Sequence, residues 1–108
     1  MTIESEEFLN EKWRKLLELD HFEHEDIIRV LQDNPDPRSV KILAKAIQLK
    51  PKLDYLEYDD YGAYYKKCLW ALVSIGTAEA FDFIRRCSMS EIPELREQAL
   101  YRLGELGN

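Results

Sequence analysis

The strongest constraint on the fold is that parts of this chain match one another at helical positions. When the sequence is shifted by 41 residues, residues 27–31 fall on 68–72, and DPRSVKIL at 36–43 falls on TAEAFDFI at 77–84. When it is shifted by 31 residues, LWALVSIG at 69–76 falls on LYRLGELG at 100–107. Each unit joins two helical patterns through a short turn. Units of this size stack into a solenoid, because one helical hairpin cannot bury its apolar face alone.

Apolar residues recur with helical spacing along most of the chain, and no segment alternates as a strand would. We therefore expect an all-α fold, an α-α solenoid of about six antiparallel helices in a single domain spanning residues 1–108. The expected helices are 5–18, 24–33, 37–49, 61–75, 78–88 and 93–106. The first would act as an N-terminal cap, and the repeat units would be 24–49, 61–88 and 93–106. The pattern of 61–75 is apolar nearly all round, so this helix should lie at the centre.

Several helix ends are marked by residues with known capping preferences. Asp36 is suited to an N-cap and Pro37 to the first helical position after it. Gly76 is suited to a left-handed C-cap, and Thr77 to the N-cap of the helix that follows. Pro93 is expected at the start of the last helix.

Two stretches resemble a known family of helical repeats. The segment LREQALYRLGELG at 95–107 resembles the first helix of a HEAT-like repeat, and CLWALVSIGTAEAFDFI at 68–84 is similar to the core of such a unit. The resemblance is good over 66–107, fair over 24–49 and missing over 1–20. It implies a small bacterial helical-repeat protein with a curved surface that binds other proteins. Some relatives in this family are associated with phycobilin lyases, but no residue here marks that activity.

The net charge of −6 is unevenly distributed along the sequence. Residues 1–26 carry nine acids and three bases, residues 27–53 carry six bases and two acids, and residues 54–60 add four acids. An acidic balance argues against nucleic-acid binding, which depends on contacts to phosphates. It favours a basic protein partner. Alternatively, the negative charge only keeps the protein soluble. Lys41 and Lys45 share a helix face, which we interpret as solvent-exposed. This basic face is the alternative to the acidic segment as the main binding surface.

The segment KLDYLEYDDYGAYYKK at 52–67 contains five of the six tyrosines. Tyrosine is enriched in interface centres, and carboxylates between the rings would attract a basic partner. The segment also makes this link about ten residues longer than the other turns, and long loops of repeat proteins often lie on the binding face. Alternatively, Tyr65 belongs to the core and Asp59 or Asp60 caps the next helix. The predicted partner-binding residues are Asp54, Tyr55, Glu57, Tyr58, Asp59, Asp60, Tyr61 and Tyr64.

Motifs for catalysis, metals and cofactors are missing from the sequence. His21 and His24 lie three residues apart without an HExxH motif, so a solvated helix start is favoured over a metal site. The acidic segment does not have the spacing of a calcium loop. Cys68 and Cys87 lie on apolar stripes and are expected to be buried free thiols. We therefore predict no catalytic residue, no cofactor and no metal.

These observations predict a cytoplasmic, non-enzymatic binding module. The N-terminus MTIESEEFLN has no apolar signal-peptide core, and no apolar run approaches the roughly 20 residues that span a bilayer. The favoured function is that of a bacterial immunity protein, which neutralises a toxin nuclease by covering its basic cleft with the acidic, tyrosine-rich patch. The alternative is a HEAT-like scaffold or a lyase-type accessory factor in protein assembly or modification.

Overall fold

The computed structural model describes residues 3–56 and 62–106, and side chains from residue 6 onward. The described part is all-α and contains six α-helices and two short 3-10 helices, with no strand, as the sequence pattern predicts. The internal repeat itself stays a prediction. The elements in chain order are α1 (Ile3–Leu16), α2 (His24–Asp33), α3 (Ser39–Leu49), η1 (Lys50–Lys52), η2 (Asp54–Leu56), α4 (Ala63–Ile75), α5 (Ala78–Cys87) and α6 (Pro93–Glu105).

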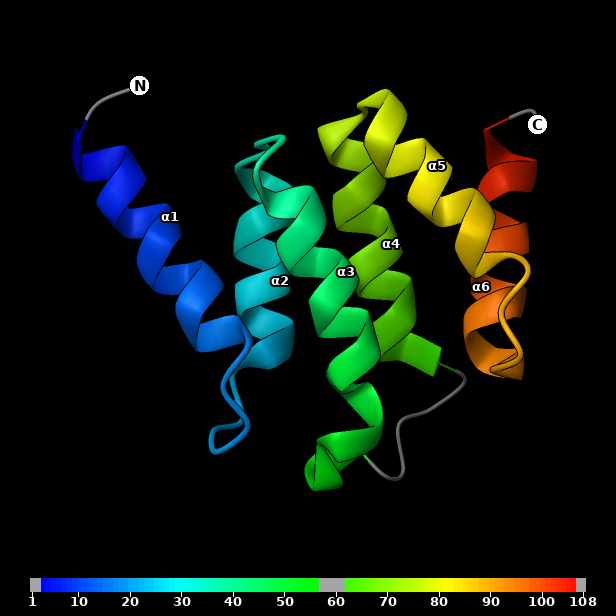
Figure 1. Cartoon of the computed structure of the whole chain (residues 1–108), viewed down its shortest axis with the longest axis horizontal. Helices are drawn as coiled ribbons and strands as arrows, with labels where there is room; N and C mark the ends of the chain where they lie inside the picture. Colours follow the sequence, from blue (N-terminus) through cyan, green and yellow to red (C-terminus); the bar gives the residue numbers. More distant parts are fainter. Residues whose placement is uncertain (1–2, 57–61, 107–108) are drawn as a thin grey trace.

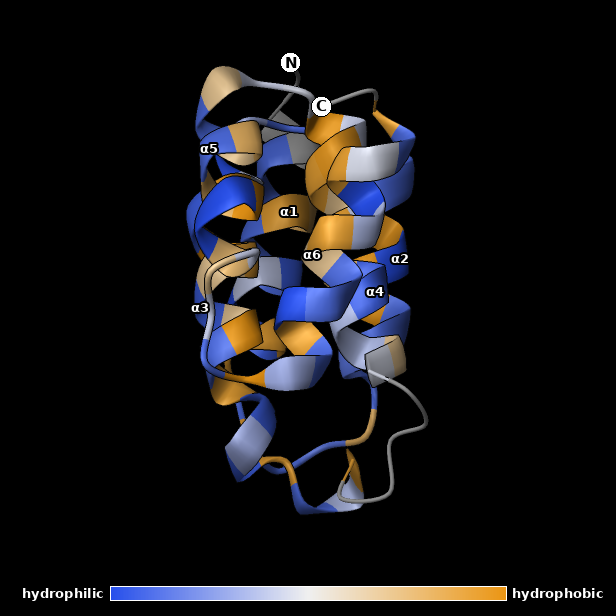
Figure 2. Cartoon of the chain, turned by 90° about the vertical axis from the view of Figure 1, so that its right-hand side faces the viewer, coloured by the Kyte–Doolittle hydropathy of each residue, from blue (hydrophilic) through white to orange (hydrophobic). Residues whose placement is uncertain are grey.

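The helices form two layers, with extents of 38 × 32 × 16 Å for the Cα trace. Helices α2, α4 and α6 lie side by side in one layer, and α1, α3 and α5 lie in the other (Figures 1 and 2). The short helices η1 and η2 follow α3 at one end of the molecule, beside the turn between α1 and α2 (Figure 1). Every helix in the described part is too short or too polar to cross a bilayer.

Helix α4 lies at the centre of the core, as its apolar pattern predicts. It contacts α2, α3, α5 and α6. Six of its thirteen residues are buried: Tyr64, Tyr65, Cys68, Leu69, Ala71 and Leu72. A helix that other helices contact on several sides needs apolar residues on each of those sides, which explains the pattern.

The C-terminal end of α4 is formed as the sequence predicts. Gly76 has a φ of 71°, and its N–H donates to the carbonyl of Leu72. Thr77 follows with an extended backbone, and its hydroxyl accepts the N–H of Ala80 at 3.1 Å. A left-handed glycine and an N-cap threonine therefore reverse the chain between α4 and α5.

Other helix ends differ from the predictions by about two residues. Helix α3 begins at Ser39 because the Asp36 carboxylate accepts the N–H of Arg38 at 2.8 Å and pairs with its guanidinium, which forms a turn before the helix. Helix α1 ends at Leu16, since the N–H groups of Leu17 and Glu18 form bonds three residues back, as in a tightened last turn.

Candidate functional site

The predicted partner-binding residues fall into three groups in the structure. Glu57, Tyr58, Asp59, Asp60 and Tyr61 lie outside the described residues. Asp54 is exposed at the start of η2, and Tyr55 next to it is half-buried. Asp54 and Tyr55, the two predicted residues that lie in η2, therefore remain candidates for a contact surface.

Tyr64 belongs to the core, so its assignment to the surface patch is corrected. Its side chain is fully buried, and its hydroxyl donates to the carbonyl oxygen of Ala46 on α3 at 2.9 Å. Burial raises the pKa of the Tyr64 hydroxyl well above its usual value. The helical position of Tyr64, one residue inside α4, turns the ring inward, whereas Tyr55 precedes the helix and remains partly exposed.

Tyr55 is held in place by His24, the first residue of α2. The Tyr55 hydroxyl lies 2.7 Å from Nδ1 of His24, and Nε2 of the same ring lies 2.6 Å from the carbonyl oxygen of Glu18. A carbonyl oxygen can only accept, so Nε2 carries the proton, and in the neutral ring Nδ1 accepts from Tyr55. The His24 side chain is fully buried, and this burial lowers its pKa.

His21 stacks on His24, with ring centroids 4.0 Å apart and an angle of 10° between the planes. Its Nδ1 accepts the N–H of Glu23 at 3.0 Å, and its Nε2 donates to the carbonyl oxygen of Lys15 at 2.5 Å. Both rings therefore satisfy backbone groups near the end of α1. The prediction of a solvated helix start was wrong for His24.

The described part of the chain contains no group of three or more His, Cys, Asp or Glu residues that could hold a metal ion. The two cysteines, Cys68 and Cys87, are free and buried. Burial raises the pKa of the Cys87 thiol to about 11, so this sulfur is protonated at neutral pH and is a poor nucleophile.

Phe22 extends the Tyr55 contact to the surface. Its ring is 79% exposed and packs edge-on against Tyr55, with centroids 5.2 Å apart. Neither residue is isolated, because Tyr55 is anchored by the buried His24. An exposed phenylalanine fixed on a tyrosine is an apolar surface that the fold leaves uncovered.

Carboxylates surround this aromatic pair. Burial raises the pKa of the Tyr55 hydroxyl, and the nearby carboxylates of Glu25 and Asp26 raise it further. Glu23 pairs with Lys15, and Glu25 pairs with Lys67 at 2.5 Å. Asp20, Asp26 and Asp54 are exposed and form no ion pair within the described residues. We define the acidic aromatic end as Asp20, Phe22, Asp26, Asp54 and Tyr55.

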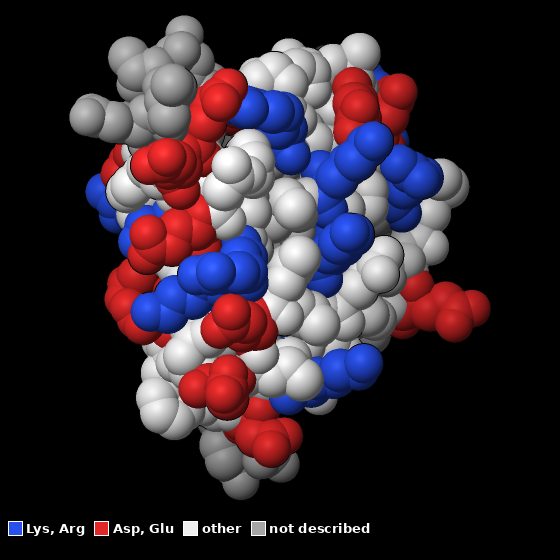
Figure 3. All heavy atoms as spheres, turned by 60° about the vertical axis from the view of Figure 1, so that its left-hand side comes forward, with Lys and Arg blue, Asp and Glu red and all other residues white. Residues whose placement is uncertain are grey.

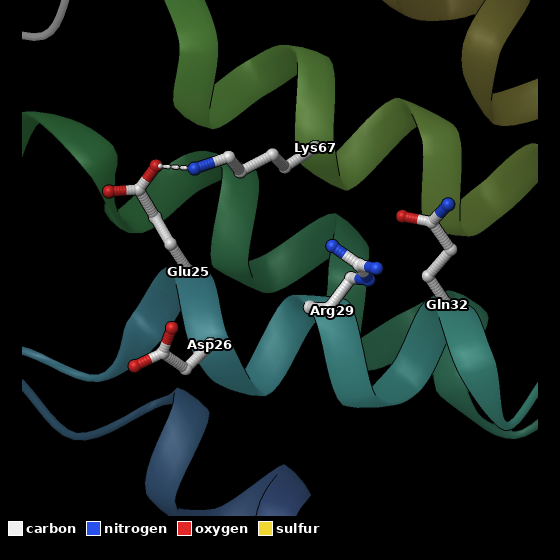
Figure 4. A pocket seen from close by; sticks show the side chains of 5 residues that line it. All are labelled: Glu25, Asp26, Arg29, Gln32 and Lys67. Atoms are coloured by element: carbon white, nitrogen blue, oxygen red, sulfur yellow. Dashed lines mark hydrogen bonds and ion pairs between the residues drawn. The ribbon is translucent and has the colours of Figure 1, made fainter.

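A polar groove between α2 and α4 adjoins this end. Its lining residues are Glu25, Asp26, Arg29, Gln32 and Lys67. Glu25 and Lys67 reach toward each other across the groove (Figure 4). Arg29 pairs with Asp33 on its own helix at 3.5 Å. Most charges of this groove are thus neutralised within the protein, which leaves little to attract a charged ligand.

Charged side chains are unevenly distributed over the surface. In Figure 3, acidic side chains gather mainly on one side of the view, and a group of Lys and Arg side chains lies to the other side of its centre. Lys41 and Lys45 of α3 are both exposed, as their spacing predicts.

The sequence interpretation did not identify Phe22 and His24 as site residues. The segment DHFEHED at 20–26 has the same mixture of aromatic and acidic residues as the tyrosine-rich segment, and this similarity could have marked it. The contact between the two segments, which lie 31 residues apart at His24 and Tyr55, follows only from the packing of α2 against α4.

Comparison with profiles of protein families finds no match, and neither the curated proteins nor the solved structures contain a significant relative.

Proposed function

We propose that this protein is a binding module that recognises a basic protein partner through the acidic aromatic end. The observation that carries the proposal is the exposed Phe22 ring on the anchored Tyr55, with three exposed aspartates nearby in the chain that form no ion pair with another described residue. An aromatic side chain held in place before binding loses little conformational entropy when a partner covers it. Aromatic residues are also frequent among those that contribute most to interface affinity.

The carboxylates contribute mainly to the rate and specificity of association. Exposed charges add little to stability, but they attract a partner of opposite charge and disfavour acidic partners. The predicted residues Glu57, Tyr58, Asp59, Asp60 and Tyr61 lie outside the described residues and stay candidates for the same contact.

Within this class we propose an immunity protein that neutralises a toxin nuclease. A nuclease cleft is basic because it must hold a polyanion, so its potential is complementary to the acidic aromatic end. The two-layer arrangement of helices supports the further interpretation as an α-α solenoid of HEAT-like units, 24–49, 61–88 and 93–106, with 5–18 as a cap. Such a scaffold would present the acidic aromatic end on a rigid support.

The test is co-expression with the product of the gene directly upstream. We expect that product to be toxic by itself and harmless beside this protein. Phe22→Ala should weaken the complex by about 2 kcal/mol or more, as expected for a central aromatic anchor. If the upstream product is harmless alone, or remains toxic beside this protein, the immunity proposal fails.

A matched pair of charge variants tests the surface. The triple variant Asp20→Asn, Asp26→Asn, Asp54→Asn should slow association at low salt and reduce its salt dependence. The control triple variant Glu79→Gln, Glu91→Gln, Glu97→Gln removes the same charge from exposed positions elsewhere. Equal effects of the two variants on the association rate would show that only net charge matters and would remove the acidic aromatic end from the proposal.

A further inference from the structure

A second groove lies on the same layer of helices, between α4 and α6. It forms a hollow of about 190 Å³ lined by Trp70, Val73, Arg102, Glu105 and Leu106. These residues lie in the second half of α4, in the second half of α6 and at Leu106 just after it, whereas the acidic aromatic end lies before α4 and around the start of α2. The two surfaces are therefore at opposite ends of the layer, and the groove is not part of the proposed immunity contact.

Arg102 is the unusual residue in this groove, because its side chain is only 4% exposed although it lies on a surface helix. Its guanidinium carbon lies 4.1 Å from the centre of the Trp70 ring and 4.8 Å from that of Tyr101. Trp70 and Tyr101 are themselves 37% and 59% exposed. A cation is thus held against two aromatic rings that remain open to solvent.

The hydrogen bonds of Arg102 are incomplete. Nη1 forms an ion pair with Oε1 of Glu105, 2.9 Å away, and the Glu105 side chain is half exposed. Nε is the only fully buried side-chain nitrogen or oxygen in the described residues that has no hydrogen-bond partner. Within the same part of the chain, no hydrogen bond from Nη2 is present. An unsatisfied buried donor is destabilising, so an acceptor at this place would be favourable.

Nε–H and the N–H groups of Nη2, which have no hydrogen-bond partner among the described residues, lie on one edge of the guanidinium. In arginine, Nε–H and the nearer N–H of Nη2 point in the same direction and match the two oxygens of a carboxylate. Glu105 occupies only the opposite nitrogen, Nη1. The neighbouring groove between α2 and α4 differs, since its Arg29 pairs with Asp33 and its Lys67 pairs with Glu25.

We propose that the groove between α4 and α6 binds an acidic side chain of a protein partner, from a segment in which Asp or Glu adjoins an apolar residue. The carboxylate accepts from the Nε–Nη2 edge of Arg102. The apolar neighbour covers Trp70, Val73 and Leu106, which are the apolar residues that line the hollow. Arginine and tryptophan together are also the commonest residues at the energetic centres of interfaces. Because Nε is covered in the free protein, the guanidinium shifts slightly on binding.

The test uses two peptides that differ only in the acidic group, acetyl-leucyl-glutamyl-leucine amide and its glutaminyl counterpart. Binding is followed by NMR through the Nε–H signal of Arg102 and the indole N–H signal of Trp70. We expect saturable shifts of both signals with the acidic peptide, and about tenfold or more weaker binding of the glutaminyl peptide, since a charge-assisted bidentate contact is lost. Equal affinities for the two peptides, or no shift with either, would overturn the proposal.

Three variants identify the contact. Glu105→Gln removes the carboxylate that already pairs with Arg102, so it should tighten binding of the acidic peptide several-fold. Trp70→Ala truncates a partly exposed side chain, leaves the buried arginine in place and should weaken binding of both peptides. Arg102→Lys keeps the charge but loses the two parallel N–H donors of the guanidinium, and should remove the preference for the acidic peptide. If the lysine variant fails to fold, the other two variants still test whether the acidic peptide binds in this groove.

The alternative to an acidic partner is self-association, and the same variants distinguish the two. If a second copy of this chain covered the groove, Arg102 would pair with Glu105 of that copy, and Glu105→Gln would weaken the assembly. Weaker binding of the acidic peptide to Glu105→Gln, or a dimer in sedimentation that this variant dissociates, would contradict the proposal.

Discussion

His24 shows at the scale of one residue how a polar side chain is accommodated in the core. Its two ring nitrogens bond Tyr55 and the carbonyl of Glu18, and both bonds are satisfied by a neutral ring. Protonated His24 would carry a buried charge 4.0 Å from the stacked ring of His21. The nearby acids Glu25 and Asp26 and the cation Lys15 face the same region from α2 and α1. The fold therefore prefers the neutral form of His24.

This preference predicts a loss of stability in mild acid. The pKa of His24 is lower in the folded protein than its ordinary value near 6.5, so the unfolded chain binds the proton more readily. The stabilisation is complete above about pH 6.5 and is lost as the pH falls through the folded pKa. We expect the free energy of unfolding in urea to decrease between about pH 7 and pH 5.

His24→Gln is the control for this pH dependence. Its amide can donate to Glu18 and accept from Tyr55, but it does not titrate. The free energy of unfolding of this variant should vary less between the two pH values. A decrease as large as that of the natural protein would assign the effect to other groups, such as the carboxylates.

At the scale of the helix, the two ends of α4 depend on glycines in the left-handed region. Gly62, before the helix, has a φ of 72°, and a Cβ there would lie 3.2 Å from Cβ of Glu94 on α6. The sequence does not indicate this close approach, because Glu94 is 32 residues away. Gly62 thus fixes both the direction of the chain entering α4 and the packing distance to α6.

We predict opposite effects of alanine at two glycines. Gly62→Ala should lower the free energy of unfolding by about 1–2 kcal/mol, because alanine is strained at positive φ and its Cβ is crowded. Gly104→Ala should raise it by about 0.5–1 kcal/mol, since Gly104 is inside α6 with nothing within 4 Å of the added atom. Urea unfolding measures both, and a stabilised Gly62→Ala protein would contradict the described geometry.

At the scale of the whole molecule, stability rests on the contacts that α4 makes with the helices on its several sides. Leu72 is fully buried there, whereas Leu100 on α6 is 54% exposed. Leu72→Ala should cost about 2–5 kcal/mol, a large part of the stability of a small domain. Leu100→Ala makes the same chemical change at the surface and should alter stability by about 0.5 kcal/mol or less. Similar urea midpoints for the two variants would show that α4 is not the centre of the core.

Most of the fold could be predicted because its signals are local. The helical spacing of apolar residues identified all six helices, and Gly76 and Thr77 marked the turn between α4 and α5 correctly. Helix ends such as that before Ser39 were shifted, because the Asp36 side chain bonds its neighbour Arg38 and forms a turn in place of the first helical residues.

The candidate site was predicted less completely. Asp54 is exposed and Tyr55 is half-buried, but Tyr64 is buried, since its place inside α4 directs the ring toward Ala46. Phe22 and His24 join Tyr55 from a segment about thirty residues away. Composition identifies aromatic and acidic residues, but not which of them share a surface.

The sequence by itself determined the all-α class, the number of helices in the described part and the central place of α4, because hydrophobic periodicity and capping act between residues a few positions apart. Only the tertiary structure decided that the buried His24 bonds Tyr55 and that Gly62 lies close to Glu94. It also decided that Arg102 stacks on Trp70 and Tyr101 with its Nε left without a hydrogen-bond partner among the described residues. Each of these depends on which helices are neighbours and at what register, and burial changes the energy of a polar group only once those neighbours are in place.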